Sequence, residues 1–68
     1  MDLWGEIGTA AGKLYSGFVG AGSSNITDVK RKTKLDDAML YMALGWLARE
    51  GKAHITVEKS VIKVKINE

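Results

Sequence analysis

The 68-residue sequence contains no cysteine and one histidine, His54, which excludes disulfides and cysteine–histidine zinc sites as sources of stability. With 46% hydrophobic and 26% charged residues, the composition is that of a globular protein rather than a disordered one. This length allows one hydrophobic core, so we expect a single domain over residues 1–68. The net charge of +2 indicates no particular partner by itself.

Membrane insertion and catalysis are both disfavoured by the sequence. The longest apolar-rich stretch, residues 3–19, is interrupted by Glu6, Lys13 and several glycines, so it is unsuited to crossing a bilayer. An acidic Asp2 stands where a secretory signal would be basic, and we therefore expect a cytoplasmic protein. His54 has no cysteine or second histidine to join it in binding a metal. We predict no enzymatic activity, no metal and no cofactor.

A first helix is predicted between an N-cap at Asp2 and a stop at Gly20 or Gly22. Apolar residues at helical spacing define its inner face: Leu3, Ile7, Ala10, Ala11, Leu14 and Phe18. Gly8 and Gly12 are four residues apart, so they share one face of this helix. They allow another element to approach closely, either within the monomer or in a dimer.

A short second helix is predicted to follow a loop over residues 20–24. Asn25 fits its N-cap, and Asp28 stands three residues later, as in a capping box. The expected inner face consists of Ile26, Val29 and Thr33, and the expected outer face of Lys30, Arg31 and Lys32. Lys34 and Leu35 then form a tight connection to the next element.

A third helix is predicted between an N-cap at Asp36 and a terminating glycine at Gly51. Its core stripe has the spacing of one helical face: Leu40, Ala43, Leu44 and Leu47. After Gly51 the hydrophobic period changes from that of a helix to that of a strand. Two strands joined by a short tip over residues 58–60 are predicted to bury one face, formed by Ala53, Ile55, Val57, Ile62, Val64 and Ile66.

The order of these elements predicts an α+β fold that is mainly helical. Three helices followed by a two-stranded β-hairpin are typical of a winged helix-turn-helix, in which the hairpin is the wing. A lone hairpin is marginally stable in water, so we expect it to pack against the helices.

Residues 40–52, LYMALGWLAREGK, resemble the signature of a family of small prokaryotic winged helix-turn-helix proteins of unassigned function. Ile7-Gly8 and the later Ala11-Gly12-Lys13 are similar to the start of the same family, so the resemblance covers nearly the whole chain. It implies a winged-helix fold and, by analogy, nucleic-acid binding. It implies no particular target, since fold alone does not establish function.

The distribution of positive charge is consistent with binding to duplex DNA through its phosphates. The cations lie on the second helix and its turn, at the end of the third helix, and on the wing. Tyr41 and Met42 are expected to face the groove beside Arg49. The predicted nucleic-acid-binding residues are therefore Lys30, Arg31, Lys32, Lys34, Tyr41, Met42, Arg49, Lys59 and Lys63.

The outer face of the third helix also supports a competing interpretation. Asp36 and Asp37 would repel phosphates at the end where recognition helices approach bases, although both also suit helix capping. Tyr41, Met42 and Trp46 form an apolar outward group, which is typical of a protein-interaction or homodimer surface. Alternatively, the first helix or the wing covers Trp46, or these side chains contact bases.

Overall fold

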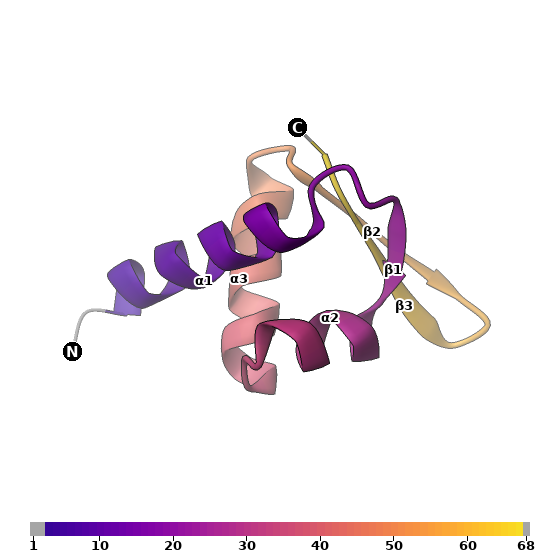
Figure 1. Ribbon diagram of the computed structural model, residues 1–68, viewed down its shortest axis with the longest axis horizontal. Coiled ribbons are helices and arrows are strands. Elements are labelled where there is room, and N and C mark those ends of the chain that lie inside the picture. Colours follow the sequence, from indigo (N-terminus) through magenta and orange to yellow (C-terminus); the bar gives the residue numbers. More distant parts are fainter. Residues whose placement is uncertain (1–2, 68) are drawn as a thin grey trace.

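The computed structural model describes residues 3–67, which form three helices and a three-stranded sheet (Figure 1). The predicted order of three helices and a terminal hairpin is confirmed, and one short strand is added before the second helix. The elements in chain order are α1 (Leu3–Phe18), β1 (Ser23–Asn25), α2 (Ile26–Thr33), α3 (Asp37–Arg49), β2 (Ala53–Glu58) and β3 (Val61–Ile66).

Helix α1 ends at Phe18, two residues before the first predicted stop at Gly20. The residues from Ala10 to Phe18 on its inner face are buried, whereas Leu3 is 46% exposed. The N-cap predicted at Asp2 lies outside the described residues. The close packing predicted at Gly8 and Gly12 is wrong for the monomer. A Cβ atom at either position would have no atom of another element within 4 Å. Both glycines border a pocket that α3 also lines with Trp46 and Leu47, so an added Cβ would extend into open space.

Part of the predicted loop before α2 is a strand. Residues 23–25 form β1 and pair antiparallel with β3, with Ser24 opposite Val64. The polar sequence Ser-Ser-Asn lacks the alternating hydrophobicity that indicates a strand, so this pairing depends on the position of β3. It makes β3 the central strand of the sheet, in the order β1-β3-β2.

The N-caps predicted for α2 and α3 are confirmed. The Asn25 side chain accepts a hydrogen bond from the backbone N–H of Thr27 at 2.9 Å, and the Asp36 side chain accepts one from Met39 at 2.8 Å. The Asp28 carboxylate, which was expected to complete a capping box, instead pairs with Arg31 one turn later. Side-chain oxygens thus accept hydrogen bonds from backbone N–H groups in the first turns of α2 and α3.

The predicted hairpin is present, but only part of its inner face is buried. Ile55 lies opposite Val64, and Val57 lies opposite Ile62. Val64 is 2% exposed, whereas Ile55 is 41% and Val57 68% exposed. The prediction that these two β2 side chains are buried is therefore wrong, because the hairpin extends beyond the helices toward its tip at Lys59 and Ser60 (Figure 1).

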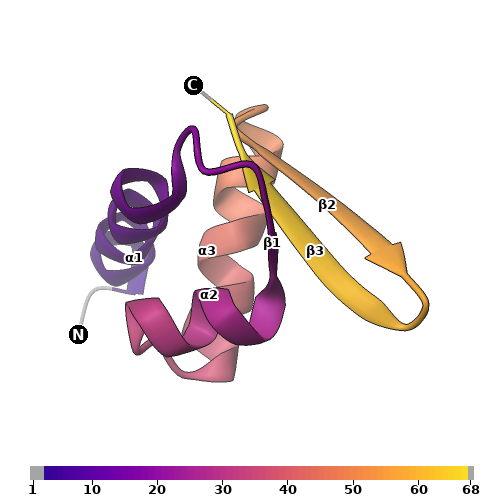
Figure 2. The ribbon, with the colours of Figure 1, turned by 45° about the vertical axis from the view of Figure 1, so that its right-hand side comes forward.

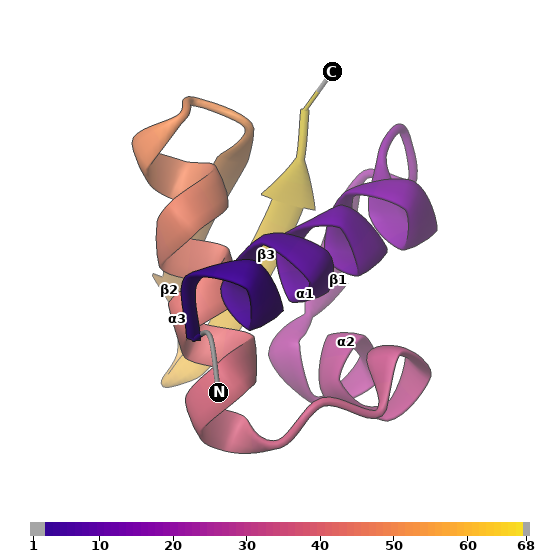
Figure 3. The same cartoon turned by 90° about the vertical axis from the view of Figure 1, so that its left-hand side faces the viewer.

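The core lies where α1, α3 and the sheet meet. Figure 2 shows α3 between α1 on one side and the sheet on the other, and Figure 3 shows α1 crossing in front of α3. The whole predicted α3 stripe is buried, together with Leu14 of α1 and Val29 of α2. The cluster comprises Ala10, Ala11, Leu14, Phe18, Val29, Leu40, Ala43, Leu44, Leu47, Val64 and Ile66.

Candidate nucleic-acid interface

The basic run on α2 is partly neutralised by acidic neighbours. Lys30 Nζ lies 2.7 Å from a carboxylate oxygen of Asp37 at the start of α3, and Arg31 pairs with Asp28 within α2. The side chains of both pairs are well exposed, so each pair contributes little to stability. Each cation is nevertheless held beside a carboxylate, which reduces the positive potential that this part of the run presents to a phosphate.

The Lys30–Asp37 pair affects two sequence-based expectations together. Hydrogen bonding and Coulombic attraction to Asp37 raise the pKa of Lys30 above its ordinary value, so this lysine is charged at neutral pH. A raised folded-state pKa means that the pair stabilises the fold at neutral pH, and this stabilisation is lost only as the pH rises through that pKa. The same contact neutralises Asp37, so the acidic end of α3 repels phosphates less than its sequence suggests.

The remaining cations of the run have different neighbours. Lys32 Nζ lies 5.7 Å from the centroid of the Phe18 ring, a cation–π arrangement that leaves the charge uncompensated. Lys34 adopts the left-handed conformation at the end of α2, where its N–H donates to the carbonyl oxygen of Lys30 at 2.9 Å. Its exposed side chain therefore projects from the turn between α2 and α3.

The outer face of the sheet carries the cations of the wing. Lys63 lies between Asn25 of β1 and Thr56 of β2, on the face opposite to that of Val64. Lys65 occupies the next outward position and lies between Ser23 and His54. The flanking residues of both lysines are therefore neutral polar or histidine, and no salt bridge to either is found within residues 3–67.

The tip of the wing adds a further positive charge. Lys59 and Ser60 form a two-residue turn, and both have positive φ values, 49° and 68°. The Lys59 side chain is exposed at the end of the hairpin. The structure thus brings Lys59 and Lys63 into one hairpin, and the β1–β3 register adds Lys65 as a candidate that the sequence-based set omitted.

The outward surface of α3 has little capacity to read base edges. Tyr41 is 49% and Met42 36% exposed, and Gly45 between them and Arg49 is exposed too. Arg49 is the cation in the last turn of this helix. Bases are usually read by arginine, lysine, asparagine or glutamine, so only Arg49 in this group has a typical base-reading side chain.

Trp46 is half-buried and packs against the core, on the side of α3 that faces α1. Its ring contacts that of Trp4 edge to face, with centroids 5.7 Å apart and an interplanar angle of 64°. The first helix therefore covers part of Trp46, as one of the sequence-based alternatives expected. Trp4 is 72% exposed and was not predicted to take part, because it lies beside the apolar stripe of α1 rather than within it.

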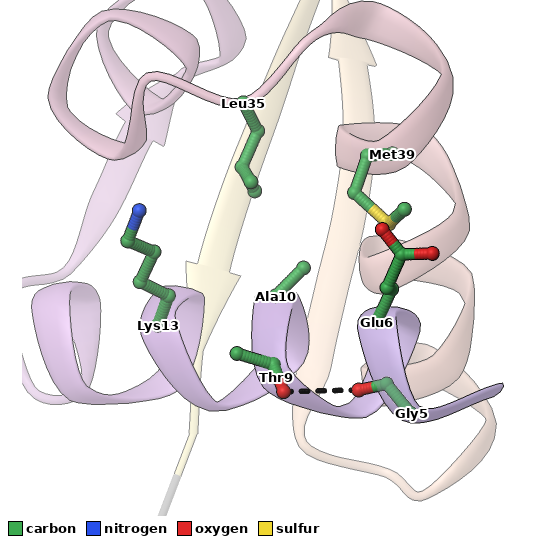
Figure 4. Close-up of a pocket in the computed structure, with 7 residues that line it drawn as sticks. All are labelled: Gly5, Glu6, Thr9, Ala10, Lys13, Leu35 and Met39. Atoms are coloured by element: carbon green, nitrogen blue, oxygen red, sulfur yellow. Dashed lines mark hydrogen bonds between the residues drawn. The ribbon is translucent and has the colours of Figure 1, made fainter. Parts of the chain in front are cut away.

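An open cleft of about 670 Å³ lies between α1 and the turn leading into α3 (Figure 4). Its floor is apolar, with Ala10, Leu35 and Met39, and α1 contributes Glu6 and Lys13 to it. Lys13 Nζ donates a hydrogen bond to the carbonyl oxygen of Thr33 at 3.3 Å. This lysine therefore helps to cap α2, where its charge suits the helix C-terminus.

Neither a metal site nor a membrane-spanning helix is found within residues 3–67. They contain no group of three or more histidine, cysteine, aspartate or glutamate side chains placed to hold a metal ion. No helix in this part of the chain is both long and apolar enough to cross a membrane.

The sequence is similar to a known protein family and to one of its relatives. Residues 1–66 match the model of the family described as winged helix-turn-helix domain (DUF2582). The chain belongs to this winged helix-turn-helix family. It is also similar to the uncharacterized protein MJ1608 of Methanocaldococcus jannaschii, with 41% identity over 68 residues that cover 94% of this chain and 97% of the relative. In the winged-helix arrangement α3 occupies the position of the recognition helix, and β2 with β3 forms the wing.

Proposed function

We propose that this winged helix domain binds duplex DNA, mainly through phosphate contacts and with little sequence selectivity, and that residues 1–68 act as one domain. Membership of the winged helix-turn-helix family supports nucleic-acid binding as the general activity. The observation that carries the phosphate-binding proposal is the outer face of the sheet, where the residues directly opposite Lys63 and Lys65 on both flanking strands are neutral or histidine. In this proposal the protein acts in the cytoplasm, where the DNA of a prokaryotic cell lies.

In this proposal the cations have distinct roles. The lysines of the wing contact the backbone directly, since no acidic partner within residues 3–67 holds them. The α2 cluster and turn anchor a second stretch of backbone, with Lys32 and Lys34 contributing more than the paired Lys30 and Arg31. The outward side of α3 contacts the DNA groove with one cation, Arg49, and with the apolar surfaces of Tyr41 and Met42. These side chains do not form a set of base-specific hydrogen bonds.

The proposal predicts a steep salt dependence of DNA binding. If about four phosphates are neutralised, log K falls against log salt with a slope of about −3.6, so affinity drops roughly a hundredfold between about 50 and 200 mM salt. Fluorescence anisotropy with labelled duplexes of two unrelated sequences measures this slope. We expect both duplexes to bind with similar affinity.

Single lysine substitutions test which surface binds. Removing one phosphate contact should weaken binding and make the slope less steep by about 0.9. We expect this change for Lys63→Ala and Lys65→Ala, and not for Lys13→Ala, which removes the same charge from α1, where Lys13 Nζ donates to the Thr33 carbonyl oxygen. Absence of binding at about 50 mM salt, or equal effects of all three substitutions, would contradict the proposal.

A second candidate function is a protein-interaction or homodimerisation module that uses Tyr41, Met42 and Trp46. Tyr41 and Met42 are exposed on α3, and this favours the protein-interaction module because contiguous exposed apolar surface is typical of partner sites. The half-burial of Trp46 against Trp4 extends such a surface to α1. NMR titration with DNA distinguishes the two candidates, since DNA binding should shift the amides of residues 30–49 and of the wing, whereas a protein-interaction module should show no shifts with DNA.

A further inference from the structure

Strand β2 forms an open edge of the sheet and has few of the features that usually protect such an edge. The sheet order is β1-β3-β2, so among residues 3–67 no strand pairs with the second side of β2. Its register with β3 is continuous from Ala53 to Glu58, without a bulge, and it contains neither lysine nor proline. The opposite edge, β1, is only three residues long. Long unprotected edges are templates for pairing with another chain.

The hydrogen-bonding phase of β2 shows which residues face the open edge. The Asn67 N–H donates to the carbonyl oxygen of Lys52 at 2.7 Å, so these two residues form a hydrogen-bonded pair just beyond the hairpin. Hydrogen-bonded and non-hydrogen-bonded pairs alternate along an antiparallel ladder. The backbone N–H and C=O groups of Ala53, Ile55 and Val57 are therefore directed away from β3, toward the open edge.

The same three residues carry the apolar side chains of β2, and their exposure increases toward the tip. Ala53 is half-buried, Ile55 is 41% exposed and Val57 is 68% exposed, although all share the sheet face of buried Val64. Figures 1 and 2 show the reason, since the helices cover the start of β2 and the hairpin continues past them. An apolar, half-covered face thus adjoins an open row of backbone donors and acceptors.

We propose that a second copy of this chain pairs with β2, antiparallel and edge to edge, about a two-fold axis at Ile55. Ile55 then lies opposite its own counterpart, and Ala53 lies opposite Val57 of the second copy. In this register every outward N–H of the three residues meets an outward C=O, and the two sheets join into one. The antiparallel direction also brings the helix-covered end of each β2 beside the uncovered end of the other, which shields Val57 from water.

Charge complementarity selects this register and favours a second copy over an unrelated strand. A two-fold axis at Ile55 places Glu58 opposite Lys52 of the second copy, and the symmetry repeats this opposite-charge pair at the other end. Lys52 is exposed and its Nζ lies 5.4 Å from the centroid of the Tyr15 ring. Among residues 3–67 no carboxylate forms a salt bridge with it. An axis at His54 would instead bring Glu58 opposite Glu50, and like charges disfavour that register.

Sedimentation velocity measures the association directly. As concentration rises, we expect the apparent mass of the wild type to approach twice the 7.4 kDa mass of the chain. We expect Val57→Lys to remain monomeric, because the substitution would bury a charge in the interface. The matched control is His54→Lys, which adds a lysine to the same strand but on its solvent-facing side. We expect this control to dimerise.

Amide exchange identifies the contact independently of any variant. Dimerisation should slow exchange of the Ile55 and Val57 amides, and dilution should restore fast exchange. The Thr56 amide, which points to β3, should remain protected at all concentrations. If Val57→Lys fails to fold, Glu58→Lys serves instead, since it should weaken the dimer and Lys52→Glu in the same chain should restore it. A wild type that stays monomeric, or a dimer with freely exchanging Ile55 and Val57 amides, would overturn the proposal.

Discussion

Replacement of Leu44 by alanine is expected to cost about 2–5 kcal/mol of unfolding free energy, the range for a buried leucine. Leu44 is 2% exposed and lies in the α3 stripe that packs between α1 and the sheet. A domain of this length has a total stability of about 3–10 kcal/mol, so this loss consumes much or all of it. Urea denaturation followed by circular dichroism measures the change.

The matched control for Leu44→Ala is Met42→Ala on the same helix. Met42 is 36% exposed and is not part of the buried cluster, so we expect a change several times smaller. Both substitutions give alanine and raise helix propensity slightly, which leaves burial as the main difference between them. Equal losses at the two positions would show that the α3 stripe is not the centre of the core.

The helical part of the fold was predictable because its signals are local. The inner stripe of α3 and the caps at Asn25 and Asp36 are read from spacing and from residue type within one turn. The β1 strand was missed since Ser23 and Ser24 have no hydrophobic alternation, and they pair only because β3 arrives beside them from the far end of the chain. Local patterns contain no information on that pairing.

The hairpin shows a second limit of sequence patterns. Alternation correctly placed Ile55 and Val57 on the same face as Val64, but the period does not tell how far the helices extend over that face. The uncovered half of β2 follows from the length of the hairpin relative to the helices. Because the helices do not reach Ile55 and Val57, apolar side chains remain exposed beside the open edge, which suits pairing with a second copy.

The basic residues of the candidate interface are visible in the sequence, but their pairing with acidic residues is not. The basic run on α2 is plain in the sequence, yet the turn at Lys34 folds α3 back so that Lys30 meets Asp37. These two residues belong to different helices, and their contact depends on the angle between those helices. The wing lysines are left as the less compensated cations.

The double substitution Gly8→Ala, Gly12→Ala is expected to stabilise the protein by about 1.5–2 kcal/mol, since each glycine in a helix interior costs about 0.8–1 kcal/mol relative to alanine. Both residues lie within α1 and have no atom of another element within 4 Å of an added Cβ. The new methyl groups therefore meet open space, and the unfolded chain loses conformational freedom. Thermal and urea unfolding measure the gain.

Gly51→Ala provides a control with the opposite expected sign. An added Cβ at Gly51 would also meet open space, but the φ of +75° at this residue is a conformation that alanine adopts only with strain. We expect a loss of stability of about 1 kcal/mol, since the cost comes from the backbone rather than from contacts. Destabilisation by the α1 double substitution, with a slower-sedimenting species at high concentration, would instead mean that the glycine face of α1 contacts another copy. Unchanged sedimentation with increased stability would leave β2 as the surface through which copies associate.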